Sequence, residues 1–313
     1  MTEKVSMRVA YGKALAAYGA VNERVVVLDA DVSASTQTHF FAKAFPSRFF
    51  NVGVAEAGMV DVAVGLALGG KIPFANTFAF LLALRAAEQV RTCVAYARTN
   101  VKLVGSYAGL SDAFDGPTHH AICDVAVMRA IPNMAVVVAA DAVEVAKLVP
   151  AVAEYDGPVY LRVSRAEVPT VFGEDYQPTI GKGSMLRDGK GLTLVATGIM
   201  VGRALTAADQ LSGQGISARV VSIHTIKPLD NELILKSATE TGAVVTVEEH
   251  SIVGGLGGAV AELLSGERPT PVVRVGLHDT FARTGPYDAL LDMCGMAVSD
   301  IVAAARRAVS LKQ

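Results

Sequence analysis

Glu56 is the single carboxylate in the apolar stretch from Asn51 to Met59. Residues 49–52 predict a buried strand, and residues 56–69 predict a helix of small apolar residues. A carboxyl group in so apolar a setting resists ionisation and seeks a hydrogen-bonding partner, and these are the properties of an acid–base residue. The structural alternative is an ordinary acid at a helix N-terminus, where the helix dipole favours it. Glu56 by itself leaves both explanations open.

Polar side chains also gather where other predicted strands end. In a chain this apolar, buried polar clusters are informative because polar groups normally stay at the surface. The clusters are Asp29, Asp31, Ser33 and Ser35, the loop 111–120, and the pair Arg162 and Arg165, with Arg8 at the start of the first predicted helix. Two arginines, a histidine and hydroxyl groups at one end of a parallel sheet could bind a phosphate. Each group alone has an ordinary explanation, such as a helix cap for Asp31, but their convergence favours a binding site.

The elements that would position these residues alternate between strand and helix. Short continuous apolar runs, typical of strands covered on both faces, alternate with stretches of helical spacing. The expected strands are 24–28, 49–52, 72–75, 101–104, 135–139, 158–163, 192–196, 218–222, 243–247 and 272–275. The expected helices are 7–18, 38–45, 56–69, 80–97, 123–130, 142–154, 200–212, 230–238, 256–264 and 298–308. This order predicts the α/β class, with doubly wound and mostly parallel sheets whose sites lie beyond the carboxyl ends of the strands.

The length of 313 residues favours two domains over one. The periodicity lapses over residues 168–184, where proline and glycine accumulate, and this composition predicts a linker. We therefore expect a first domain over 1–167 and a second domain over 185–313.

The composition excludes several classes of protein. A net charge of −2 argues against a surface for nucleic acid or anionic membrane, and no apolar run is long enough to span a bilayer. The three scattered cysteines lack metal-ligand spacing, and the start of the chain lacks a signal-peptide pattern, so we expect a cytoplasmic protein with buried free thiols.

The chain also lacks the glycine-rich motifs that bind diphosphates and any spacing typical of metal ligands. Gly254 to Gly258 could hold an anion at a helix start, but tight packing of a helix on a sheet is the favoured explanation. By its own residues the chain is expected to hold neither a diphosphate nor a metal. If it is an enzyme, part of its site must come from another chain.

Five motifs in one order resemble a known family. They are the segment around Glu56, Asp115-Gly116-Pro117-Thr118-His119, the segment from Leu28 to Ser35, Asn76-Thr77-Phe78, and Val163-Ser164-Arg165. Together they resemble the C-terminal half of a transketolase, over residues 5–310. The long form of that family carries an N-terminal domain that binds the cofactor's diphosphate and a metal ion, and this half is absent here. The chain therefore looks like the second subunit of a split transketolase, a pyrimidine-binding domain followed by a transketolase C-terminal domain.

The resemblance implies a cofactor and partners. Thiamine diphosphate would bind with Mg²⁺ or Ca²⁺ held by an N-terminal partner subunit, and this chain would form a self-dimer within a heterotetramer. The reaction would move a two-carbon ketol unit from a ketose phosphate to an aldose or aldose phosphate. In the family, a glutamate that hydrogen-bonds N1′ of the aminopyrimidine promotes loss of the proton on the thiazolium C2, and Glu56 matches it.

The resemblance also implies roles for other residues. His119 would contact donor hydroxyls and assist proton transfer, Asp115 would bind a sugar hydroxyl, and Asp31 would lie near the thiazolium ring. Three residues would grip the phosphate at the far end of the sugar, namely Arg8, Ser35 and Arg165.

The chain departs from the family pattern in two places. Tyr107 stands where family members usually have a histidine, and it can donate a hydrogen bond but brings no positive charge. Phe78 is the expected aromatic contact of the pyrimidine, but the second family aromatic falls on Leu81, with Phe80 one position off. Ala113 and Phe114 also replace a more polar pair, which suggests an unusual sugar.

Other functions remain open at this point. Two use thiamine diphosphate as well: the beta subunit of a 2-oxo acid dehydrogenase and 1-deoxyxylulose-5-phosphate synthase. The Asp115 to His119 loop and the arginine–serine set argue against the dehydrogenase. A third alternative is a non-catalytic subunit that supports a partner, and the presence of Glu56, Asp115 and His119 argues against it.

Overall fold

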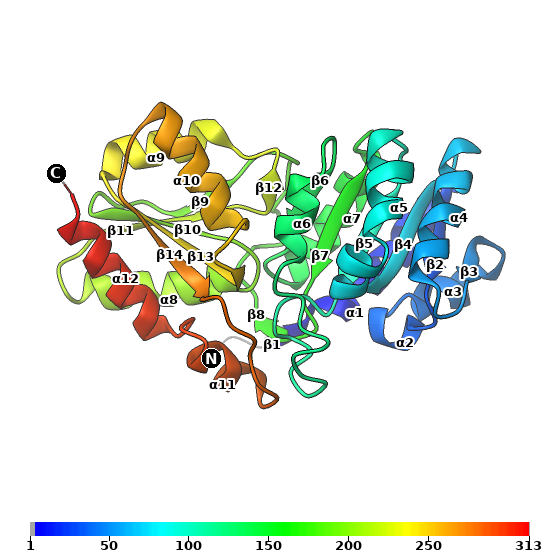
Figure 1. The fold of residues 1–313 in the computed structure, drawn as a ribbon, viewed down its shortest axis with the longest axis horizontal. Coiled ribbons are helices and arrows are strands. Elements are labelled where there is room, and N and C mark those ends of the chain that lie inside the picture. Colours follow the sequence, from blue (N-terminus) through cyan, green and yellow to red (C-terminus); the bar gives the residue numbers. More distant parts are fainter. Residues whose placement is uncertain (1–3, 313) are drawn as a thin grey trace.

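The computed structural model describes residues 4–312 and contains two α/β units that lie side by side (Figure 1). The first unit is built on a sheet with the strand order β12-β6-β7-β5-β4-β2-β3, in which β2 to β7 pair in parallel. These strands are β2 (Val25–Asp29), β3 (Phe49–Asn51), β4 (Ile72–Phe78), β5 (Lys102–Ser106), β6 (Ala135–Val138) and β7 (Val159–Val163). Parallel pairing brings their carboxyl ends to one edge of the sheet, so the loops that follow them can form one site.

Helices cover both faces of this sheet (Figure 1). On one face α1 packs on α7 over Val25, Val27 and Phe74, and on the other face α4 packs over Leu28 and Ala75 while α6 packs on β6. The helices of this unit are α1 (Met7–Val21), α2 (Ser33–Thr36), α3 (His39–Ala44), η1 (Pro46–Arg48), α4 (Glu56–Leu68), η2 (Leu81–Arg85), α5 (Ala87–Gln89), η3 (Val90–Tyr96), α6 (Asp124–Ala130) and α7 (Ala142–Glu154). Burial on both faces explains why most strands of this sheet are continuous apolar runs.

The second unit has the strand order β14-β13-β10-β11-β9, with β9 antiparallel at the edge. Its strands are β9 (Ser184–Arg187), β10 (Leu192–Ala196), β11 (Ala218–Ser222), β13 (Val244–Ser251) and β14 (Val272–Leu277). Its helices are α8 (Met200–Ser212), α9 (Asn231–Thr241), α10 (Leu256–Glu267), α11 (Tyr287–Met293) and α12 (Val298–Ser310). The expected class of two mostly parallel α/β units is confirmed.

The second half of the chain contributes a strand to the first sheet, which the sequence patterns did not predict. Strand β12 (Thr225–Lys227) pairs antiparallel with β6 at the edge of that sheet. A second small sheet joins β1 (Lys4–Ser6) to β8 (Glu167–Pro169). Elements of three residues are too short to show a period in the sequence.

The expected linker contains no helix or strand between residues 170 and 183, although β8 occupies its start. The boundaries 1–167 and 185–313 remain a prediction.

Three local expectations were wrong. The strand at 49–52 is an edge strand rather than a buried one, and Phe50 is 39% exposed. The helix at 80–97 is not regular α-helix, because wider i→i+5 turns at η2 and η3 flank the short α5. The three cysteines are unpaired as expected, but each is partly exposed.

Candidate active site

Tyr107 is the centre of a cluster at the carboxyl ends of β4, β5 and β7. It directly follows β5 and has a φ of 61°, a conformation that bulky side chains rarely adopt and that often marks a functional position. The guanidinium groups of Arg8 and Arg165 lie 5.0 Å and 4.8 Å from the centre of its ring. Nη1 of Arg8 donates to the Tyr107 hydroxyl at 3.1 Å and to the backbone oxygen of Ser35 at 2.6 Å. The structure thus brings Tyr107 together with the three residues expected to grip the phosphate, with Ser35 taking part through its backbone oxygen.

Asp112 also belongs to this cluster, and no sequence motif singled it out. Its Oδ1 accepts a hydrogen bond from Nη1 of Arg165 at 2.7 Å, and the same nitrogen lies 3.9 Å from Oδ2 of Asp115. Asp112 is fully buried, and its Oδ2 has no hydrogen-bond partner among the described residues. Burial, together with the neighbouring Asp115, raises the pKa of the Asp112 carboxyl. Asp112 lies within the loop 111–120, which the sequence indicated as a polar cluster, but the motif that resembles the family begins only at Asp115.

Aromatic side chains continue the cluster towards His119. The rings of Phe78 and Tyr107 are 4.4 Å apart, and those of Phe80 and His119 are 5.1 Å apart. Nδ1 of His119 is within 2.9 Å of the Thr118 hydroxyl. Phe78, Phe80 and His119 are each partly exposed, so this end of the cluster offers an accessible aromatic surface beside the arginines.

Glu56 begins α4 and is only 2% exposed. Both of its carboxyl oxygens lie 3.0 Å from Nη1 of Arg85, whose own side chain is 55% exposed. The prediction that apolar residues surround Glu56 is therefore wrong on one side, where the guanidinium group of Arg85, at the end of η2, covers the carboxyl group. Leu81, at the start of η2, is partly exposed.

Asp31 is exposed and has a φ of 65°, and Nδ2 of Asn51 donates to its carboxylate at 2.8 Å. It does not cap α2, which begins after Val32 without a side-chain cap. Asp29 instead orders this loop, because its buried carboxylate accepts hydrogen bonds from the Val32 amide and the Thr36 hydroxyl. Asp31 and Glu56 follow the neighbouring strands β2 and β3, and no side-chain hydrogen bond between described residues joins them to the Tyr107 cluster.

Arg162 does not belong to the anion-binding cluster, so its inclusion was wrong. It is 4% exposed and forms a buried ion pair with Asp124, with Nε to Oδ2 at 2.7 Å. Its Nη2 also donates to the backbone oxygens of Ala121 and Glu249, and thus links the two units. The glycine-rich segment at Gly254 is a packing feature, since Glu248 already accepts the free amides at the start of α10.

We expect Asp124→Asn to destabilise the fold strongly, because it leaves the Arg162 guanidinium charged and buried without its partner. The expected loss in the free energy of unfolding is about 3–5 kcal/mol. Urea unfolding followed by circular dichroism measures it. Glu88→Gln is the matched control, since the pair of Glu88 with Arg91 is fully exposed and its loss should leave the midpoint unchanged. Equal midpoints for both variants would contradict a structural role for the buried pair.

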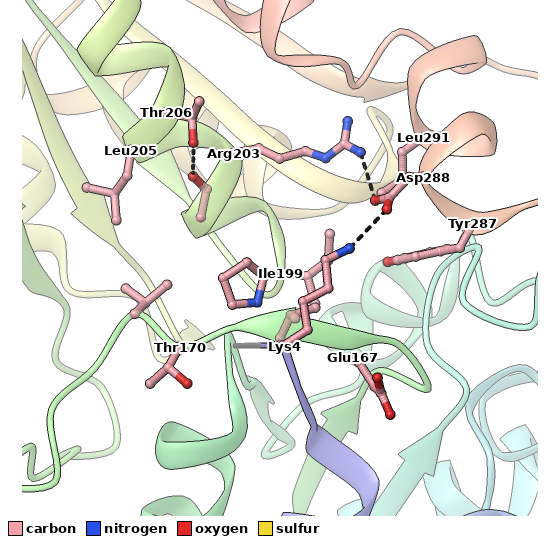
Figure 2. A pocket seen from close by; sticks show the side chains of 14 residues that line it. Lys4, Glu167, Thr170, Ile199, Arg203, Leu205, Thr206, Tyr287, Asp288 and Leu291 are labelled. Atoms are coloured by element: carbon pink, nitrogen blue, oxygen red, sulfur yellow. Dashed lines mark hydrogen bonds and ion pairs between the residues drawn. The ribbon is translucent and has the colours of Figure 1, made fainter. Parts of the chain in front are cut away.

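A cavity of about 440 Å³ lies beside the site, where β1 and β8 meet α8 and α11 (Figure 2). Three of its four charged residues pair with one another, since Asp288 accepts from Lys4 at 3.1 Å and from Arg203 at 3.2 Å. None of the expected site residues lines it. The cavity is therefore a separate feature of the junction between the two units.

Across residues 4–312, no group of three histidine, cysteine, aspartate or glutamate side chains is arranged to hold a metal ion. In the same part of the chain, no helix combines the length and the apolar character needed to cross a membrane.

Comparison with known proteins places both units in one family. Residues 3–170 match the model described as "Transketolase, pyrimidine binding domain", and residues 181–301 match "Transketolase, C-terminal domain". A 6-deoxy-6-sulfo-D-fructose transketolase subunit from a Clostridium species is 44% identical, with 98% of this chain and 95% of the relative covered. One of the subunits of an apulose-4-phosphate transketolase from Phocaeicola vulgatus is 42% identical, with 82% of each chain covered.

A solved structure is also similar over its full length. A split-gene transketolase described as an inactive β4 tetramer is 50% identical, with a TM-score of 0.91 and with 99% of this chain and 100% of that chain covered.

Proposed function

The chain belongs to the transketolase family, and from this premise we propose that it is the C-terminal subunit of a split, thiamine diphosphate-dependent transketolase. It would move a two-carbon ketol unit from a ketose that carries a distal anion to an aldose. The observation that carries the proposal is the Tyr107 cluster, in which two arginines meet at the same strand ends as accessible aromatic side chains. When bound, thiamine diphosphate supplies the thiazolium ring that carries the two-carbon unit.

The described residues fit one half of this cofactor. Glu56 offers a buried carboxyl group for N1′ of the aminopyrimidine, and Phe78, Phe80 and Leu81 offer partly exposed apolar surface. Asp31 would place a negative charge near the thiazolium ring. Since no described side chains form a cluster for a metal ion, the diphosphate and its Mg²⁺ or Ca²⁺ would be held by an N-terminal partner subunit.

The substrate would lie along the rest of the cluster. His119 would contact the donor hydroxyls and help to move a proton, and Asp115, which is exposed at the mouth of the loop, would bind a sugar hydroxyl. The far end of the sugar would meet Arg8, Ser35, Tyr107 and Arg165. An arginine is suited to this task because its planar fork donates two parallel hydrogen bonds to a tetrahedral anion.

The surface of α4 supports an assembly with other chains. Apart from Glu56 and Asp61 this helix is apolar, yet only four of its residues are buried, and Val62 and Leu68 are 46% and 76% exposed. Val54 and Leu84 add to the same exposed apolar set. Apolar surface of this kind marks a protein–protein interface. We propose that it is covered in a heterotetramer that contains a self-dimer of this chain and two N-terminal subunits.

The thiamine-dependent alternatives are 1-deoxyxylulose-5-phosphate synthase and the beta subunit of a 2-oxo acid dehydrogenase. Similarity to a split transketolase subunit over 95% of its length favours ketol transfer over both. Transfer of an acyl group to lipoamide without any ketol transfer would decide for the dehydrogenase. A non-catalytic supporting role would be shown by full activity of the complex when Glu56 and His119 are both replaced.

Arg165→Ala tests the distal anion site. We expect the KM for an anionic ketose to rise by about 10- to 100-fold, because one charge-assisted contact of roughly 1.5–3 kcal/mol is lost. The kcat/KM for a ketose without a distal anion should be nearly unchanged. Steady-state kinetics of the reconstituted complex measure both, with Arg187→Ala in the second unit as the control. Equal losses on both ketoses would mean that Arg165 is structural and that the anion binds elsewhere.

A further inference from the structure

One arginine of the distal site is already paired with a buried carboxylate. Nη1 of Arg165 is 2.7 Å from Oδ1 of Asp112, and Asp112 is fully buried while Arg165 is 35% exposed. Exposed Asp115 and Glu167 also lie near the two arginines, but water screens exposed charges well. Asp112 is buried, so water does not screen its charge in the same way. When the Asp112 carboxyl is ionised, its buried negative charge offsets one of the two positive charges of Arg8 and Arg165.

The residue between the arginines adds no positive charge. Tyr107 is neutral and 5% exposed, and its hydroxyl accepts a hydrogen bond from Arg8. Its own proton stays available for a ligand oxygen. The site therefore offers many donors for a tetrahedral anion but, with Asp112 ionised, only about one net positive charge to balance it.

Phosphate and sulfonate, two anionic groups that a sugar can carry at its far end, differ in charge. A phosphate monoester carries a charge of about −1.5 to −2 at pH 7, whereas a sulfonate carries a single charge and presents the same three tetrahedral oxygens. A phosphate on Arg165 would lie beside the buried Asp112 carboxylate, and like charges in a buried contact are costly. A sulfonate makes the same hydrogen bonds with less repulsion. Built-in repulsion of this kind is a common source of specificity.

We propose that Asp112 is a specificity-determining residue that makes the distal site select a ketose sulfonate over a ketose phosphate. This inference rests on the proposed transketolase function and names the substrate class of the same site. The relatives include subunits named for a sulfonated and for a phosphorylated sugar, so their names alone do not decide between the two.

Asp112→Asn tests the inference, because asparagine keeps the size and the acceptor to Arg165 while it removes the charge. The chain is reconstituted with its N-terminal partner and assayed with fructose 6-phosphate and with 6-deoxy-6-sulfofructose, which differ only at the distal group. We expect the wild type to prefer the sulfonate. In the variant, the kcat/KM ratio of phosphate to sulfonate should rise by at least about tenfold, mainly through a lower KM for the phosphate.

Two further variants make the result decisive. Asp209→Asn is the matched control, since Asp209 is exposed in the second unit and should leave the ratio unchanged. Tyr107→His leaves Asp112 in place and adds a group that can carry positive charge, so it should shift the ratio in the same direction even if Asp112→Asn does not fold. A wild type that prefers the phosphate, or a ratio unchanged by both site variants, overturns the role of Asp112. A wild-type complex that turns over neither ketose overturns the proposed function itself, and the two failures are thus distinct.

Discussion

Purified without a partner, the chain is expected to show no ketol transfer, with turnover below about a thousandth of that of the reconstituted complex. The reason is the division of the cofactor site. The described residues provide a carboxyl group and apolar surface for the pyrimidine, but no cluster for a metal ion. On the lone chain, the diphosphate of thiamine diphosphate would have neither a metal ion nor hydrogen-bond donors, and it would remain surrounded by water. Thiamine diphosphate should therefore bind the lone chain weakly and without dependence on Mg²⁺.

Calorimetry of the lone chain, with and without Mg²⁺, measures the binding, and addition of the N-terminal subunit should restore turnover in proportion to complex formation. Tight, Mg²⁺-dependent binding by the lone chain would refute the split-site proposal.

Glu56→Gln is expected to slow hydrogen–deuterium exchange at C2 of bound thiamine diphosphate by at least about 10²-fold, the effect of losing a positioned acid–base group. Glutamine keeps the size of the side chain and its acceptor oxygen, so the complex should still fold and bind the cofactor. An amide cannot exchange a proton with N1′ as a carboxyl group does, and added substrate should not restore the rate. Quenched NMR measures the exchange, and thermal unfolding measures stability in parallel.

The contact of Glu56 with Arg85 provides the control for this experiment. If Glu56 served only to hold Arg85, then Arg85→Gln would reproduce the Glu56→Gln phenotype. A half-exposed ion pair of this kind contributes about 0–1 kcal/mol to stability. We expect Arg85→Gln to leave C2 exchange within a fewfold of the wild type. Near-normal exchange in Glu56→Gln, with only a small loss of stability, would make Glu56 an ordinary helix N-terminal acid.

Much of the fold could be predicted from local sequence. Strands such as β2 and β6, buried on both faces, appear as apolar runs, and α7 and α12 show clear helical spacing. These patterns are local because a strand or helix repeats its environment every two or about four residues. The two-unit α/β architecture follows from their order along the chain.

The contacts of the site depended on tertiary structure. The sequence placed Glu56, Tyr107 and Arg165 at strand ends, and parallel pairing brings such ends to one edge. It did not show that Arg85 would cover Glu56 from 29 residues away, or that Arg162 would be buried against Asp124 from 38 residues away. Arg162 lies inside β7, whereas Arg165 follows the end of that strand, so the two side chains have different surroundings although they are three positions apart.

What the sequence determined by itself was therefore the elements, their order and the chemical types at their ends. The tertiary structure decided which of those groups pair, and with what net charge. Asp112 and Arg165 are separated by 53 residues, and only the packing of β5 against β7 brings their charges together. The pairing of β12 with the first sheet was invisible for the same reason, since three residues carry no period and the strand β6 that they join is contributed by the other half of the chain. Pairing between distant residues depends on which surfaces the fold brings into contact, and no local pattern contains that information.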